Sequence, residues 1–344
     1  LGLRNRANSH GRRGFHGEMK ALVYEGVEYL VFRDMPDAEP KNGEHLIRVE
    51  AVGICGSDMH AYLGHDNRRP APLILGHEAA GIIDGGPRDG TRVTVNPLVT
   101  CGTCAACAAG RENLCPDRQI ISMPPREGAF AQYIAMPETN LVEVPEDIAP
   151  DKAALAEPLA VSWHAARLAL EALHPSMERR ALVIGGGAIG LAAALALEAM
   201  GVGDITVVEP NDLRRDFLTS QCRQCAVAAA AGTYSLLIDA VGYAATRTTA
   251  SALASPGGVV VHVGLGEDIG GLDVRRMTLQ EITFIGTYAY TAEDFRDTAQ
   301  AIFDGRLGTL DWCDHRPLAD GFAAFQDLRA GKVAAPKIVL SPWG

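Results

Sequence analysis

The spacing of apolar residues changes along the chain and divides it into two parts. In the first part apolar and polar positions alternate, as in Leu46–Val52, which is typical of half-buried strands. From about Leu159, short apolar runs alternate with longer Ala- and Leu-rich segments. The predicted strands there are 181–184, 205–208, 236–239 and 259–263, and the predicted helices are 188–200 and one that begins at residue 211. Strands in alternation with helices predict parallel βαβ units, so we expect a doubly wound sheet.

The pattern changes again after Gly286. An amphipathic helix is predicted over Ala292–Phe303, and a short apolar segment, Lys337–Leu340, closes the chain. We therefore predict an α/β protein in which the chain returns to its first domain. The predicted units are a mobile leader at 1–18, a β-rich catalytic domain at 19–157 and 291–344 with a lobe at about 96–116, and a dinucleotide-binding domain at 158–290.

Composition narrows the function classes. The 344 residues carry a formal net charge of −11, and 47% are apolar against 21% charged, which excludes a disordered chain and disfavours a nucleic-acid partner. The uncharged stretch 181–197 contains three consecutive glycines and falls short of the roughly 20 apolar residues of a membrane span. Residues 1–18 are basic without an apolar core, so we expect no secretory signal, no membrane partner and a cytoplasmic location.

A glycine-rich turn, G-x-G-x-x-G, follows a predicted strand and opens a predicted helix, which indicates a dinucleotide site. The first glycine makes the turn, the second admits a pyrophosphate, and the third lets the helix pack on the strand. The positions assigned to this site are Gly185, Gly187, Ala188, Ile189 and Gly190, with Val263 and Gly264 at the end of a later strand.

An acidic residue predicts which dinucleotide is bound. Glu209 ends the next strand, where a carboxylate accepts hydrogen bonds from both adenosine ribose hydroxyls and repels a 2′-phosphate. NAD is therefore favoured over NADP. Arg214 and Arg215 follow closely, and either guanidinium could receive a phosphate if the loop turned it inward; the alternative is a solvent-exposed helix face.

Four closely spaced cysteines predict a structural zinc site. They are Cys101, Cys104, Cys107 and Cys115. Four thiolates close a tetrahedral shell around zinc and leave no position for substrate. Zinc is favoured over disulfides, because disulfide frameworks are typical of small secreted domains.

A second group of potential metal ligands is scattered along the chain. Cys55 stands in Cys-Gly-Ser-Asp, His77 in Gly-His-Glu and Glu157 in Glu-Pro. Catalytic zinc sites combine three protein ligands with one free position, and a thiolate, an imidazole and a carboxylate supply that number. Taken singly, however, a cysteine or a histidine is more often a buried core residue than a ligand.

The motifs taken together resemble those of the zinc-dependent medium-chain alcohol dehydrogenases, above all the sorbitol and L-idonate dehydrogenase branch. The five motifs occur in the family's order and at close to its spacings over residues 19–344. The resemblance implies a GroES-like catalytic domain and a Rossmann-type cofactor domain. It implies NAD-dependent oxidation of a secondary alcohol, diol or polyol, one catalytic and one structural zinc per chain, and a homodimer or homotetramer.

The resemblance also implies metal ligands and their support. Cys55, His77 and Glu157 would hold the catalytic zinc, with Glu78 as an adjacent or exchanging ligand. Asp58 would orient His77 through its free ring nitrogen, as zinc-binding histidines generally require.

It further implies a proton path, in which Ser57 accepts the proton of the alcohol and His60 passes it to solvent. Zinc lowers the pKa of bound water from 15.7 to about 7 and should likewise favour an alkoxide, which releases hydride to the nicotinamide. The domains would align the reactants in the cleft between them and exclude water.

The substrate pocket departs from the family pattern. Ala289 stands where sugar-alcohol members carry an Arg before a Tyr, and Ile120 and Met123 align with a Phe and a Thr that contact the polyol. We therefore expect a more apolar pocket and a substrate smaller or less hydroxylated than sorbitol. The alternative is that polar contacts come from Tyr62, His65 or Tyr290.

The segment at about 225–236 also departs, because it is too short for a crossover with a full helix. We predict a trimmed or absent helix, an adenine side that is more open, and weaker NAD affinity. Cys222, Cys225 and Cys313 are predicted to be unremarkable thiols.

Three other functions stay open. The same chemistry could act on a sugar acid or an L-threonine-like substrate. A zinc-free reductase of the same fold is disfavoured, because it would not need Cys55, His77 and Glu157 together. A non-catalytic NAD-binding relative would be favoured by one zinc per chain instead of two.

Overall fold

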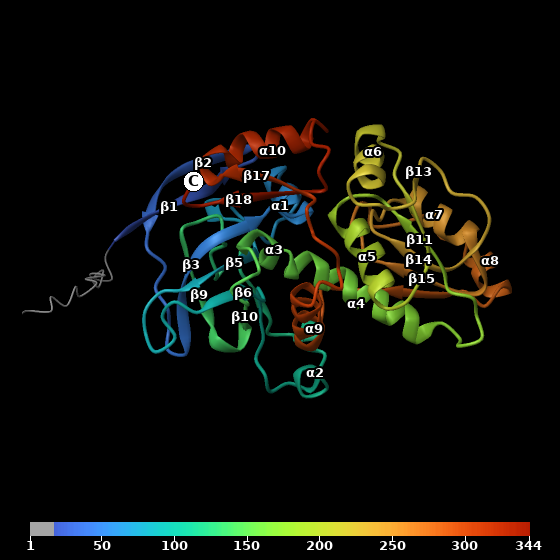
Figure 1. Cartoon of the computed structure of the whole chain (residues 1–344), viewed down its shortest axis with the longest axis horizontal. Coiled ribbons are helices and arrows are strands. Elements are labelled where there is room, and N and C mark those ends of the chain that lie inside the picture. Colours follow the sequence, from blue (N-terminus) through green and yellow to red (C-terminus); the bar gives the residue numbers. More distant parts are fainter. Residues whose placement is uncertain (1–16) are drawn as a thin grey trace, which may run out of the picture.

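Two sheets of different character organise the molecule (Figure 1). The computed structural model describes residues 17–344. The predicted leader therefore lies outside the described residues, except at its end, where Glu18 is already the first residue of strand β1 (Glu18–Gly26). In the described part of the chain, no helix is long and apolar enough to cross a membrane.

The N-terminal part is built mainly on antiparallel strands. These are β1, β2 (Tyr29–Pro36), β3 (Glu44–Gly53), β4 (Leu73–Ile74), β5 (Glu78–Ile83), β6 (Arg92–Val95), β7 (Leu98–Val99), β8 (Gln119–Ile120), β9 (Tyr133–Pro137) and β10 (Leu141–Glu143). In β3 the predicted alternation is confirmed, since Ile47 and Val49 are buried and Arg48 between them is not. The connections carry α1 (Gly56–Tyr62), α2 (Ala105–Ala108), η1 (Glu112–Leu114) and η2 (Glu138–Asn140).

Strands β2-β1-β4 and β7-β8 form two small sheets, and the C-terminal segment joins the remaining strands in a seven-stranded sheet. Its elements are β17 (Cys313–Pro317), η3 (Leu318–Asp320), α10 (Gly321–Arg329) and β18 (Lys337–Ser341). The sheet order is β10-β6-β5-β3-β18-β17, with β9 also paired to β3. Strand β18 runs antiparallel to β3, with Val339 opposite Gly53, so the end of the chain lies beside its beginning.

The middle part forms a six-stranded parallel sheet in the order β13-β12-β11-β14-β15-β16, with helices packed against it. Its strands are β11 (Arg180–Ile184), β12 (Asp204–Val208), β13 (Ala226–Val227), β14 (Tyr234–Asp239), β15 (Ala254–His262) and β16 (Thr283–Gly286). The helices of this part are α4 (Ala156–Ala172), α5 (Ala188–Ala199), α6 (Asp212–Ser220), α7 (Ala244–Leu253) and α8 (Val274–Leu279). The short helix that precedes them, α3 (Pro150–Ala154), packs instead against the antiparallel sheet. The strand order is that of the Rossmann fold, whose ligands bind outside the carboxyl ends of the strands where the order reverses.

The predicted short crossover is confirmed. The described chain has no helix between β13 and β14, and only a loop returns from one strand to the other. Strand β13 is correspondingly brief and pairs with β12 through Ala226 and Val227.

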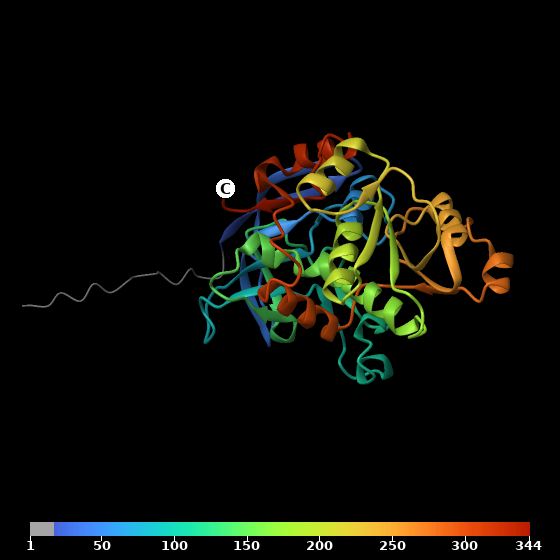
Figure 2. The same ribbon diagram turned by 45° about the vertical axis from the view of Figure 1, so that its right-hand side comes forward.

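Helix α9 (Ala292–Phe303) has the predicted bounds, but it packs with helices of the parallel sheet. Its buried residues Phe295, Ala299 and Ile302 pack in the core of the parallel sheet, together with residues of α4 and α5. The apolar face of α9 is thus buried against α4, although the predicted boundary at residue 291 assigned this helix to the catalytic domain. The loop that carries α2 stands out from the body below α9 in both views (Figures 1 and 2).

Candidate functional site

The four predicted structural ligands come together in the loop around α2. The ligand atoms of Cys101, Cys104, Cys107 and Cys115 all lie within 4.8 Å of one another. The Sγ–Sγ distances are 4.0 Å between Cys101 and Cys107, 3.5 Å between Cys104 and Cys107, and 3.6 Å between Cys115 and Cys101. Zinc–sulfur bonds of about 2.3 Å in a tetrahedron place sulfurs about 3.8 Å apart, so this donor set fits zinc.

The backbone of the loop also lowers the pKa of one of these thiols, which favours the thiolate form that a metal binds. Backbone N–H groups of Thr103 and Cys104 donate to the sulfur of Cys101 and lower its pKa to about 6. Desolvation, followed by the thiol of Cys104, raises the pKa of Cys107 to about 11. A bound cation is needed to keep all the sulfurs deprotonated at neutral pH.

A second donor cluster joins Cys55, His77 and Glu78, whose ligand atoms lie within 4.8 Å of one another. Cys55 lies between β3 and α1, and Glu78 opens β5 opposite Gly53 of β3. A side chain at Gly53 would place its Cβ 2.0 Å from Oε2 of Glu78, so the glycine makes room for the carboxylate. A thiolate, an imidazole and a carboxylate are a donor set that fits catalytic zinc.

The carboxylate of this cluster is that of Glu78. The family resemblance implies Glu157 as a ligand and Glu78 as an adjacent or exchanging one, and of these two predicted acids Glu78 is the one grouped with Cys55 and His77. Glu157, in the first turn of α4, instead accepts a hydrogen bond of 2.9 Å from the hydroxyl of Tyr290. Burial, assisted by the nearby carboxylate of Glu78, raises the pKa of Glu157 to about 7. Glu157 therefore lies beside the cluster as a group able to hold or release a proton at neutral pH.

Lys337 is a site residue that the sequence analysis missed. Its Nζ lies 2.6 and 2.7 Å from the two carboxylate oxygens of Glu78 and donates to the backbone oxygen of Ile54 at 2.9 Å. The side chain is only 3% exposed. A lysine at the start of an otherwise apolar closing strand was the available signal.

His77 is held in the orientation that the sequence analysis expected. Its Nδ1 lies 3.5 Å from Oδ1 of Asp58 and 3.4 Å from Oγ of Ser122. Burial alone would raise the pKa of Asp58, but His77 and other partners outweigh it and the pKa is lowered. The backbone N–H groups of Cys55 and Gly76 also donate to this carboxylate, at 2.9 and 3.2 Å. Because Nδ1 is engaged, Nε2 is the ring nitrogen available to a metal.

The predicted proton path is only partly assembled. Ser57 is half-buried on α1, and its carbonyl accepts a hydrogen bond of 2.7 Å from the buried Arg69. His60 is exposed on the same helix. Within residues 17–344 no hydrogen bond joins Ser57 to His60, so the relay stays a prediction. The alternative that gave Tyr62 a substrate contact is wrong, since this side chain is buried against Phe325.

Most of the predicted cofactor residues line a cavity of about 410 Å³ that also reaches Cys55 of the metal cluster. Its walls include Gly185–Gly190, Cys55 and Lys337. A Cβ at Gly190 would lie 1.7 Å from the oxygen of Gly185, whereas a Cβ at Gly187 would meet nothing within 4 Å. The third glycine therefore permits helix packing, and the second leaves the open space that a pyrophosphate requires.

Glu209 organises the far end of this cavity. Oε2 accepts a hydrogen bond of 3.0 Å from the backbone of Gly186, and Oε1 accepts one of 2.8 Å from Asn211. Arg214 lies 3.5 Å from the same carboxylate and lines the cavity. Arg215 bonds the carbonyl oxygen of Glu209 and is turned toward the start of α6.

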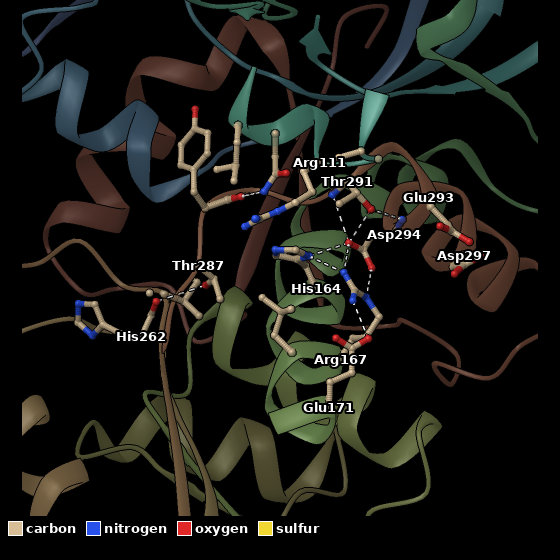
Figure 3. A pocket seen from close by; sticks show the side chains of 18 of the residues that line it. Arg111, His164, Arg167, Glu171, His262, Thr287, Thr291, Glu293, Asp294 and Asp297 are labelled. Carbon is tan, nitrogen blue, oxygen red and sulfur yellow. Dashed lines mark hydrogen bonds and ion pairs between the residues drawn. The ribbon is translucent and has the colours of Figure 1, made fainter. Parts of the chain in front are cut away.

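The predicted positions Val263 and Gly264 are not in the lining of this cavity. Val263 lines a larger one of about 830 Å³, between the α2 loop, α4, α9 and the ends of β15 and β16. Figure 3 shows His164, Arg167 and Asp294 joined on one side of it. The walls of this second cavity come from four segments that are distant in the chain, so no sequence motif predicts it.

Comparison with known proteins identifies the family. Residues 41–146 match the alcohol dehydrogenase GroES-like domain. The chain is 42% identical over 208 residues to sorbitol dehydrogenase of Bacillus subtilis (strain 168), spanning 57% of each protein. It is 30% identical over 317 residues to L-galactonate-5-dehydrogenase of Escherichia coli (strain K12), spanning 87% of this chain and 91% of that protein. The chain belongs to the zinc-type medium-chain dehydrogenases.

Within this family the chain falls in the sorbitol and L-idonate dehydrogenase branch, whose named members are oxidoreductases. Its fold agrees with solved members. The structure of galactitol-1-phosphate dehydrogenase from Escherichia coli superimposes with a TM-score of 0.83 at 23% identity and covers 94% of this chain and 100% of that one. At that identity the superposition shows the shared fold alone.

Proposed function

We propose that this medium-chain dehydrogenase catalyses the reversible, NAD-dependent oxidation of a polyol, diol or secondary alcohol to the ketone. Cys55, His77 and a carboxylate, Glu78 or Glu157, would hold the catalytic zinc. The supporting observation is that one cavity is lined by both Cys55 and the glycine turn Gly185–Gly190. A hydroxyl substrate at the metal cluster and a dinucleotide at the glycine turn would therefore be held in one cavity, which is the proximity that the reaction requires.

The residues of the site have distinct tasks. When bound, zinc supplies a Lewis acid that lowers the pKa of an oxygen ligand, and NAD supplies the hydride acceptor. Asp58 fixes the ring of His77, and Lys337 holds the carboxylate of Glu78. Glu157, with a pKa raised to about 7 by burial, can hold a proton beside the cluster, and Ser57 is the proposed first acceptor.

Other parts of the proposal follow from the same site. Glu209 supports NAD, and the four-cysteine loop supports a second, structural zinc. We propose a β-rich catalytic unit and a parallel-sheet cofactor unit, a cytoplasmic location, and a homodimer or homotetramer. No nucleic-acid or membrane partner is part of the proposal.

The residues near His77 support a particular substrate class. Ser122, which contacts His77, lies between Ile120 and Met123, so the segment with the apolar replacements lies at the metal cluster. This favours a less hydroxylated polyol or a secondary alcohol over sorbitol. The similarity to L-galactonate-5-dehydrogenase keeps a sugar acid as the second candidate.

A substrate panel tests the proposal. NADH absorbance would be followed with sorbitol, xylitol, 2,3-butanediol, 2-propanol, L-threonine and L-galactonate, before and after zinc removal by a chelator. We expect the highest kcat/KM with a diol or secondary alcohol and loss of activity without zinc. A sorbitol kcat/KM well above that of simple secondary alcohols would reject the apolar pocket, and activity that survives zinc removal would reject the zinc mechanism.

A further inference from the structure

The segment 288–292, here called the strap, connects β16 to α9 and carries a residue of the proposed catalytic centre. Its middle residue is Tyr290, which is 1% exposed and donates to Glu157 at 2.9 Å. The ring of Tyr290 also lies 5.6 Å from that of Phe295, in the core of the parallel sheet. The position of the strap therefore sets where the Glu157 carboxylate is held.

Side chains of the four-cysteine loop contact both ends of the strap. At one end, Nδ2 of Asn113 donates to the backbone oxygen of Tyr288 at 2.8 Å, and the guanidinium of Arg118 lies 4.8 Å from the centre of the Tyr288 ring. At the other end, the carboxylate of Glu112 accepts a hydrogen bond of 3.3 Å from the backbone of Ala292. These three loop residues flank Cys115, one of the four metal ligands.

Part of the strap borders open space. Tyr288 and Thr291 line the cavity of about 830 Å³. On the other side Ala289 packs against the core of the parallel sheet, and Thr291, which lies beside Asp294 in Figure 3, is hydrogen-bonded to it, so the four-cysteine loop supports the strap on the side where packed side chains are fewest. Ala289 has a φ of 48°, in the left-handed region that residues other than glycine rarely adopt. Asn113 is 4% exposed, and its Oδ1 has no partner among the described residues, so its buried amide is committed to the strap.

We propose that the four-cysteine loop is a positioning element for the catalytic centre, in which Asn113 holds the strap and the strap, through Tyr290, holds Glu157. The inference rests on the proposed function, because it takes Glu157 as part of the zinc-dependent centre. Loss of the Asn113 hydrogen bond loosens the position of Glu157. Asn113 is neither a member of the Cys55 donor cluster nor part of the glycine turn. Neither Asn113 nor the strap lines the cavity of about 410 Å³ that holds the glycine turn, although Asn113 shares the larger cavity with Val263, so we expect NAD binding at the glycine turn to change little.

The test is a double-mutant cycle with a matched control. Asn113→Ala, Tyr290→Phe and the double variant would be compared with the wild type. Arg111→Ala is the control, since Arg111 lies on the same loop, is exposed, and its side chain has no hydrogen-bond or ion-pair partner among residues 17–344, while its backbone bonds to Ala106 and Leu114 do not depend on the side chain. The readouts are kcat, the KM for NAD, and the rate at which zinc is lost from the second donor cluster to a chromogenic chelator.

We expect each single variant to lower kcat and speed that zinc loss roughly tenfold, the usual size of effects from groups that support metal ligands. The KM for NAD should stay within about twofold, and the double variant should be no worse than Tyr290→Phe alone, since both act on one chain of contacts. Arg111→Ala should behave like the wild type.

The inference is overturned if Asn113→Ala matches Arg111→Ala, or if the effects of Asn113→Ala and Tyr290→Phe multiply. If Asn113→Ala fails to fold, Asn113→Asp keeps the side-chain shape but cannot donate to the Tyr288 oxygen, and it must show the same losses. A wild type without zinc-dependent dehydrogenase activity would instead overturn the proposed function.

Discussion

Glu209 serves the fold and, in the proposed function, the cofactor. Its carboxylate accepts backbone hydrogen bonds from Gly186 and Asn211 and faces the cavity. The same oxygens can accept hydrogen bonds from ribose hydroxyls, and their charge repels a 2′-phosphate.

Replacing this acid should therefore change the dinucleotide preference. We expect Glu209→Ser to lower kcat/KM with NAD at least about tenfold, because a hydrogen bond to a charged group contributes about 1.5–3 kcal/mol and the loss of even one bond to the ribose has this effect. The kcat/KM with NADP should rise, since Arg214 then loses its acidic partner. Kinetics with both dinucleotides check this, with Asp216→Ser on the exposed face of α6 as control. An unchanged ratio of kcat/KM with NAD to kcat/KM with NADP would contradict the assignment of Glu209 to the ribose.

At the residue scale, the sequence predicted which side chains could bind a metal better than it predicted how they are arranged. Cys55 and His77 were identified and do meet. The choice between Glu78 and Glu157 was not visible, because it depends on Lys337 and Tyr290, which are distant in the chain. Such partners are set by the register of β18 against β3 and by the strap, which only tertiary structure defines.

The turn before α5 allows packing and cofactor binding to be separated. At Gly190 a Cβ would clash with the oxygen of Gly185, whereas at Gly187 it would meet open space.

We expect Gly190→Ala to reduce the free energy of unfolding by about 1–3 kcal/mol, the usual cost of overpacking. Gly187→Ala should stay within about 1 kcal/mol of the wild type but bind NAD at least roughly tenfold more weakly, because its methyl group occupies space meant for the pyrophosphate. Urea unfolding and NAD titration distinguish the two. Equal NAD affinity of Gly187→Ala and the wild type would show that the turn does not bind the dinucleotide.

Helix α9 begins with a buried charge network. Asp294 is 2% exposed and bonds His164 at 2.7 Å, Arg167 at 2.7 Å and Thr291 at 2.8 Å. Burial alone would raise the pKa of Asp294, but these hydrogen bonds outweigh it and hold the pKa well below its usual range. A depressed pKa stabilises the fold above the unfolded pKa of about 3.9, and this contribution is lost as the pH falls below that value.

Asp294→Asn should therefore lower the free energy of unfolding at pH 7 by about 3 kcal/mol, since it leaves His164 and Arg167 without their anion. The difference from the wild type should persist at pH 5 and shrink below about pH 4. Urea unfolding across this range measures it, and Asp297→Asn, exposed on the same helix, is the control. A difference that is constant down to pH 3 would contradict the ion-pair explanation.

At the element scale, strong periodicity predicted well. The bounds of α9 and the strands β11, β12 and β14 follow their apolar patterns, and the short loop before β14 followed from chain length alone. The side on which α9 packs was not predictable, because its amphipathic face suits either core and tertiary contact with α4 decides.

On the scale of the whole molecule, the two donor clusters lie in different surroundings. The four-cysteine cluster lies on a loop that stands out from the body, and a metal held by its four thiolates would have no free position for substrate. The Cys55 cluster adjoins the cavity that reaches the glycine turn. The order of motifs predicted this arrangement, whereas the contact between the loop and the strap required the folded chain.

The most direct test is zinc content together with activity for the wild type, Cys55→Ala and Cys101→Ala. We expect two zinc ions per wild-type chain and one in each variant. Cys55→Ala should remain folded but lose its dehydrogenase activity, because it lacks the catalytic metal, whereas Cys101→Ala should lose stability. A Cys55→Ala variant that keeps full activity would contradict the account.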